Sequence, residues 1–133
     1  GDPGRYRFLG TISKVLAKED YVVIPGVSTV QIAFARIGER WEDATLLSLH
    51  GRKMDDLVAR VEGSMKTFLF TDPSFSPEKI AAYLLEKGMD NRRAIVMENL
   101  TYPDERIVDT DLKSLRGMKG FGMCVMIIKK ETK

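Results

Sequence analysis

Short apolar runs typical of β-strands alternate with helical segments along most of this 133-residue chain. The runs lie at residues 44–49, 67–70, 94–100 and 123–128, and between them apolar residues recur every three or four positions. Such alternation predicts an α/β fold with a mixed, mainly parallel sheet, because a helix between two strands returns the chain to the same end of the sheet. The short turn at residues 102–105 instead predicts one antiparallel hairpin.

The helix expected after residue 76 has a clear start and stop. Ser76 offers a hydroxyl cap, Pro77 suits the first helical position, and Glu78 lies near the positive end of the helix dipole. Gly88 then predicts its end.

The first third of the chain predicts a strand at residues 21–24, a turn, and a second helix. Ser28 or Thr29 is the expected cap, and Gly38 the expected stop. The apolar face of this helix is expected to carry Val30, Ala33, Phe34 and Ile37. Residues 39–43 are polar and turn-like, and they form the one plausible domain boundary.

Composition excludes several classes of function. A net charge of only +2 argues against bulk attraction to nucleic acid or to an anionic membrane. A single cysteine, Cys124, excludes an internal disulfide, and with a single histidine, His50, it makes a Cys/His zinc site implausible. No apolar stretch approaches the roughly 20 residues that span a bilayer, and the first residues lack signal-peptide character. We therefore expect a soluble, cytoplasmic protein without a bound metal.

The candidate binding loops follow predicted strands, where ligands of open α/β sheets are bound. They contain Pro25-Gly26-Val27-Ser28, His50-Gly51-Arg52, Thr71-Asp72-Pro73 and Glu98-Asn99. Each alone has an ordinary structural explanation: Gly26 and Ser28 suit a plain turn and helix cap, and a single histidine is more often only hydrogen-bonded. No Ser-His-Asp order, metal-ligand cluster or activated nucleophile is present, so no catalytic residue is assigned. An enzyme of this kind would depend on positioning and on a reactive cofactor.

Taken in order, five loops resemble those of the tetrapyrrole methylases. They begin with Gly1-Asp2-Pro3 and Ile24-Pro25-Gly26-Val27-Ser28, and continue with the segments "LHGR", "TDPSFSPEKIAAYLLEKG" and "ENLTYPDERI". Members of this family transfer a methyl group from S-adenosylmethionine to precorrins and related rings, leaving S-adenosylhomocysteine. Within the family, the last three segments are most similar to the branch that methylates C5 of (cobalt-)precorrins in the cobalamin pathway.

The resemblance implies two α/β domains with the cofactor between them, an anionic tetrapyrrole substrate, and a homodimer. Family members place further βα units before the Gly-Asp-Pro loop, so residues 1–43 are expected to be the rear part of an N-terminal domain. Residues 44–133 would be nearly all of the C-terminal domain, and this chain alone is expected to be inactive. The implied cofactor residues are Gly1, Asp2, Pro3, Gly26, Ser28, Phe70, Thr71, Asp72, Gly122 and Met123, and the implied substrate residues are His50 and Arg52.

Two other functions remain open at this point. The chain could be a non-catalytic α/β module for binding or dimerisation, since its second part is long enough for a core of its own. It could also belong to an anion-binding α/β enzyme of unrelated chemistry, because helix starts offer free N–H groups to carboxylates and phosphates.

Overall fold

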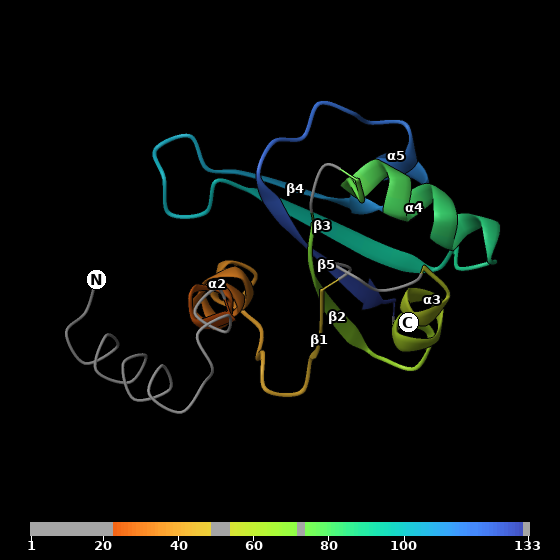
Figure 1. The fold of residues 1–133 in the computed structure, drawn as a ribbon, viewed down its shortest axis with the longest axis horizontal. Coiled ribbons are helices and arrows are strands. Elements are labelled where there is room, and N and C mark those ends of the chain that lie inside the picture. The colour runs from red at the N-terminus through yellow and green to blue at the C-terminus, as the bar shows by residue number, and fades with distance from the viewer. Residues whose placement is uncertain (1–22, 49–53, 72–73, 132–133) are drawn as a thin grey trace. The chain divides into compact units, whose positions relative to one another are not determined.

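The computed structural model describes residues 23–48, 54–71 and 74–131 (Figure 1). The chain divides into two compact units between Trp41 and Glu42. The first unit contains helix α2, and the second contains all of the described strands together with three helices.

Helix α2 spans Val23–Arg36. Val30, Ala33 and Phe34 recur at helical spacing and are fully buried, which confirms the predicted apolar face at these three positions. The helix stops at Gly38, as predicted. Gly38 has φ of +70°, a value open to glycine, and the next N–H, that of Glu39, donates back to the carbonyl of Phe34 over 3.0 Å.

The predicted strand at residues 21–24 and the predicted turn at Pro25 are wrong where the structure describes them, because Val23 onward is helical. Proline is tolerated in the first turn of a helix, where the N–H groups have no intrahelical partner. Gly26 and Ser28 therefore belong to the first turns of α2 rather than to a loop before it.

The second unit contains the predicted alternation of strands and helices. Its elements in chain order are β1 (Thr45–Ser48), α3 (Met54–Glu62), β2 (Lys66–Phe70), α4 (Pro77–Glu86), β3 (Arg92–Glu98), β4 (Arg106–Asp111), α5 (Leu112–Arg116) and β5 (Cys124–Lys130).

The described strands form a five-stranded sheet in the order β1-β2-β5-β3-β4. The α/β class and the mixed sheet are confirmed, as is the antiparallel β3–β4 hairpin. The expectation of a mainly parallel sheet is wrong, because only the β1–β2 pairing in this part of the chain is parallel. The cause is β5: β1, β2 and β3 do run the same way, but β5 runs oppositely between β2 and β3 and separates them.

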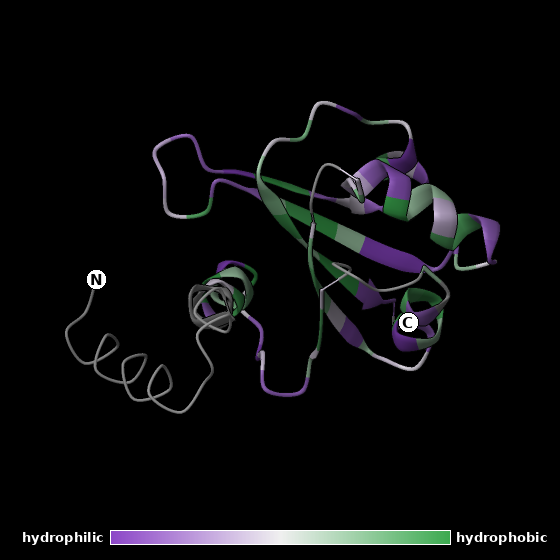
Figure 2. Ribbon diagram, in the orientation of Figure 1, coloured by the Kyte–Doolittle hydropathy of each residue, from purple (hydrophilic) through white to green (hydrophobic). Residues whose placement is uncertain are grey.

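Helices α3, α4 and α5 of the second unit pack on one face of this sheet (Figure 1). The strands contribute side chains at alternate positions to the shared core, among them Leu69, Val96 and Met126, which lie side by side in register. Figure 2 shows how hydrophobic residues concentrate in these strands. This core fixes the sheet and therefore fixes where the strands end.

Helix α4 begins at Pro77, as predicted, and Gly88 follows its end with φ of +88°. The expected cap differs in one respect. The Ser76 hydroxyl makes no cap hydrogen bond, and its Oγ is buried without a partner in the described structure.

Candidate functional site

Several of the loops that the sequence singled out leave the sheet of the second unit at one end. Because β1, β2 and β3 run the same way, their last residues, Ser48, Phe70 and Glu98, lie at the same end. Strands β5 and β4 begin at this end with Cys124 and Arg106, both of which pair with Glu98. Loops far apart in the sequence therefore leave the sheet beside one another.

Four predicted cofactor residues meet at the adjoining ends of β2 and β5. Phe70 pairs with Val125, so Phe70 and Thr71 lie next to the segment that contains Gly122 and Met123. The Thr71 hydroxyl strengthens this junction by donating to the Cys124 carbonyl over 2.7 Å. It also lies 3.1 Å from the Cys124 sulfur.

The remaining predicted site residues are not among those that the structure shows together at this end. Gly1, Asp2, Pro3, His50, Arg52 and Asp72 lie outside the described residues. Gly26 and Ser28 belong to the first unit and have helical backbone in α2. Their roles stay predictions.

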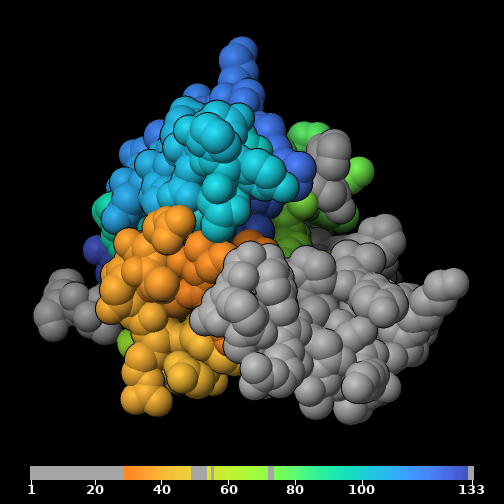
Figure 3. Space-filling view, turned by 90° about the vertical axis from the view of Figure 1, so that its left-hand side faces the viewer, coloured from red at the N-terminus to blue at the C-terminus, as the bar shows by residue number. Residues whose placement is uncertain are grey.

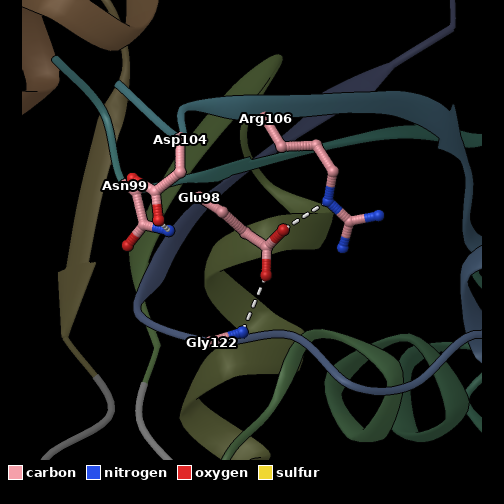
Figure 4. Close-up of polar contacts among 5 residues, drawn as sticks. All are labelled: Glu98, Asn99, Asp104, Arg106 and Gly122. Atoms are coloured by element: carbon pink, nitrogen blue, oxygen red, sulfur yellow. Dashed lines mark hydrogen bonds and ion pairs between the residues drawn. The ribbon is translucent and has the colours of Figure 1, made fainter. Parts of the chain in front are cut away.

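A buried carboxylate, Glu98, is the main feature of this end to which the sequence reasoning gave no role, although it named Glu98-Asn99 as a candidate loop. Its Oε1 accepts from Arg106 Nε, and its Oε2 accepts from the Gly122 N–H over 2.7 Å (Figure 4). A charged residue closing the apolar run of β3, with an arginine at the start of the returning strand, was the available sequence signal.

These contacts set the charge at this end of the sheet. The hydrogen bond from Arg106 lowers the pKa of Glu98, burial opposes this, and the bond from Gly122 adds to the lowering. The Glu98 side chain is therefore an ionised carboxylate at neutral pH. Burial raises the pKa of the Cys124 thiol, which is a small core residue as predicted.

The turn between β3 and β4 projects beside this end and lies at the surface (Figure 3, cyan). Its backbone has positive φ at Asn99 (51°) and Thr101 (73°). Two hydrogen bonds hold it: Asn99 Nδ2 donates to Asp104 over 3.0 Å, and the Thr101 N–H donates to Glu105 over 2.8 Å. Hydrogen bonds between its own residues thus stabilise the turn.

Two kinds of feature are missing from the residues that the structure describes. No group of three or more His, Cys, Asp or Glu side chains among them could hold a metal ion. No described helix is long and apolar enough to cross a membrane.

Comparison with known proteins identifies the family. The model of the tetrapyrrole (corrin/porphyrin) methylases matches residues 1–116. The chain belongs to this family. Its fold is therefore that of a tetrapyrrole methylase, as the resemblance predicted.

Individual relatives are informative about the branch. The chain is 34% identical over 120 residues to the probable cobalt-precorrin-7 C(5)-methyltransferase of Methanocaldococcus jannaschii, which covers 87% of this chain and 54% of the relative. The chain thus spans about half the length of this curated relative.

Solved structures show the same fold. The precorrin-6Y methylase of Archaeoglobus fulgidus aligns with a TM-score of 0.54 at 18% identity, over 77% of this chain and 45% of that chain. The uroporphyrin-III C-methyltransferase of Thermus thermophilus, complexed with S-adenosylhomocysteine, aligns with a TM-score of 0.53 at 17% identity, over 66% of this chain and 40% of that chain.

Three of the predicted cofactor residues that the structure describes have surfaces that suit a flat ring such as adenine. Met123 is 78% exposed, and Phe70 is half-buried at the end of β2. A Cβ at Gly122 would meet only Glu98 Oε2, at 3.9 Å, so the backbone there is open to a close approach. An aromatic ring, a thioether and open backbone are groups that pack against a heteroaromatic ring.

Proposed function

We propose that the whole protein to which these residues belong is an S-adenosylmethionine-dependent C-methyltransferase acting on C5 of a precorrin or cobalt-precorrin in cobalamin biosynthesis. The observation that carries the proposal is the 34% identity to the cobalt-precorrin-7 C(5)-methyltransferase of M. jannaschii. The T. thermophilus neighbour complexed with S-adenosylhomocysteine supports the choice of cofactor.

In this proposal the end of the sheet forms one wall of the cofactor site. Phe70 and Met123 offer apolar surface to the adenine, and Gly122 offers its Cα and carbonyl, because its N–H is already bound to Glu98. The Thr71 hydroxyl donates to the Cys124 carbonyl and lies within reach of the Cys124 thiol, which leaves one oxygen lone pair for a ligand donor. The other proposed cofactor residues are Gly1, Asp2, Pro3, Gly26, Ser28 and Asp72, and His50 and Arg52 are proposed to face the substrate.

The proposed reaction needs few acid or base groups from the protein. Bound S-adenosylmethionine supplies an electrophilic methyl group on its sulfonium sulfur. The residues of the chain bind the two partners, align them and exclude water, which lowers the barrier through pre-formed geometry. We assign no catalytic acid or base.

The 133-residue chain alone is proposed to be inactive, because it spans only 54% of the M. jannaschii relative. A homodimer stays a prediction from the family resemblance, and a cytoplasmic location stays a prediction from composition. A second function, a non-catalytic α/β module for binding or dimerisation, is favoured by one observation: the second unit has a hydrophobic core of its own, built by its sheet and its three helices.

Calorimetric titration with S-adenosylhomocysteine tests these proposals. We expect the protein encoded by the complete gene to bind, and the 133-residue chain not to bind. Absence of binding by the complete protein would refute the methyltransferase proposal. If the complete protein also forms a stable dimer without binding, the module is the better description.

A further inference from the structure

The buried carboxylate of Glu98 carries an inference beyond the family. Glu98 is the last residue of β3, whose preceding residues Ala94, Ile95, Val96 and Met97 are all apolar and buried. Glu98 itself is only 7% exposed. A carboxylate in such a position is costly unless donors satisfy its oxygens.

The donors come from two other elements of the second unit. Arg106 opens β4, and Gly122 lies in the loop that leads from α5 into β5. Each supplies one donor to a different oxygen, so the carboxylate links three elements at once (Figure 4). Hydrogen bonds to an ionised acceptor are roughly twice as strong as neutral ones.

Arg106 contacts the same loop a second time. Its guanidinium carbon lies 5.5 Å from the ring centroid of Phe121, the neighbour of Gly122. A cation over an aromatic face is attracted by the ring electrons. Glu98 and Arg106 therefore hold two successive residues of the loop.

Burial holds this loop only in part, through Met118 and Phe121, which pack against the hydrophobic core. Lys119, Gly120, Gly122 and Met123 are exposed, and Gly120 has φ of +85°. Beyond Gly122, the Met123 carbonyl accepts from the Asn99 N–H over 3.1 Å, which continues the contact with β3. The hydrogen bonds to Glu98 and from its neighbour Asn99 thus fix the exposed backbone just before β5, next to the point where Phe121 packs on the core.

We infer that Glu98 is a positioning residue for cofactor recognition: with Arg106 it fixes the Gly122 backbone and so sets how Gly122 and Met123 meet the adenine ring. This rests on the proposed function, in which these two residues contact the cofactor. Glu98 acts through the loop and does not itself touch the ligand.

The test compares Glu98→Ala and Glu98→Gln with a matched control, Asp109→Asn. The control removes another carboxylate paired with an arginine across the same two strands, Arg93–Asp109 at 2.9 Å, but that pair is solvent-exposed. A glutamine side chain has one carbonyl oxygen that accepts and one NH2 group that donates, so it satisfies only one of the two donors. The effect of Glu98→Gln should therefore be intermediate.

Two measurements separate positioning from a general loss of stability. Hydrogen exchange of the Gly122 amide in the 133-residue chain should accelerate at least tenfold in Glu98→Ala and be unchanged in Asp109→Asn. In the complete protein, S-adenosylhomocysteine and S-inosylhomocysteine are titrated, the second differing only in the purine ring. The preference for adenine should fall at least fivefold in Glu98→Ala, whereas overall destabilisation would weaken both ligands equally.

The outcomes distinguish the two proposals. If the complete wild-type protein binds no S-adenosylhomocysteine, the proposed function fails and the role of Glu98 in recognition fails with it. If the wild type binds and Glu98→Ala keeps both the affinity and the adenine preference, the inference alone is overturned. Should Glu98→Ala not fold, an unchanged Gly122 exchange rate and an unchanged preference in Glu98→Gln overturn it in the same way.

Discussion

The left-handed backbone at Thr101 gives a prediction with an unusual sign: its replacement by glycine should stabilise the protein. Thr101 has φ of +73° in the β3–β4 turn, and its side chain is exposed. An L-residue in this region loses about 1–2 kcal/mol to the clash of its Cβ with the backbone, and a β-branched residue is especially unfavourable.

Replacement by glycine removes this strain, but it also destabilises the folded state by a smaller amount. Its freedom in the unfolded chain costs roughly 0.5–1 kcal/mol. The hydrogen bond to Glu105 survives, because the donor is the Thr101 backbone N–H. The difference predicts that Thr101→Gly raises the free energy of unfolding by about 0.5–1 kcal/mol.

Urea unfolding of the 133-residue chain, followed by circular dichroism, measures this change. The control is Tyr102→Gly, next in the same turn and also exposed, whose φ is not positive. It should lower the stability, because glycine there relieves no strain. A Thr101→Gly variant that is destabilised as much as the control would refute the strain argument.

Two further predictions concern the end of the sheet. The lowered pKa of Glu98 means that its pairing contributes stability above the unfolded carboxyl pKa, about 4.3, and loses it as the pH falls through the lower folded pKa. Urea midpoints between pH 6 and pH 3 should therefore fall more steeply in the wild type than in Glu98→Gln, and equal slopes would contradict this assignment. Thr71→Val should lower the free energy of unfolding by about 1 kcal/mol, because it removes the hydroxyl that donates to the Cys124 carbonyl. Thr71→Ser keeps that donor and should recover most of the loss; equal losses in the two variants would show that the hydroxyl is not the cause.

Local features of the fold were predictable because their causes are local. Pro77 marks the start of α4, and Gly38 and Gly88 adopt the positive φ that ends a helix. The short turn before Arg106 predicted the antiparallel hairpin that the structure confirms. The same kind of reasoning failed at Pro25, where a proline suits both a turn and the first turn of a helix.

Long-range features were not predictable from these patterns. An apolar run such as Cys124–Lys130 indicates a strand but does not indicate its neighbours, so the insertion of β5 between β2 and β3 could not be read from it. That insertion brings Thr71 and Gly122 together, and only the family resemblance had associated them beforehand. The link between Glu98, Arg106 and Gly122 depends on the same insertion, because Gly122 approaches Glu98 only once β5 lies beside β3.

The central position of β5 also has a consequence for the order of folding. Until residues 124–130 are available, β1 and β2 form one pair and β3 and β4 another, with nothing in the described sheet to join them. The strand pairing of Lys66 with Lys129 can form only after Lys129 has left the ribosome. Pairings so distant in sequence are slow to form, because the entropic cost of closing the long loop comes before any contact offsets it. Until β5 emerges, the nascent chain therefore exposes the edges of β2 and β3 that will later pair with it, a state that invites aggregation or chaperone binding.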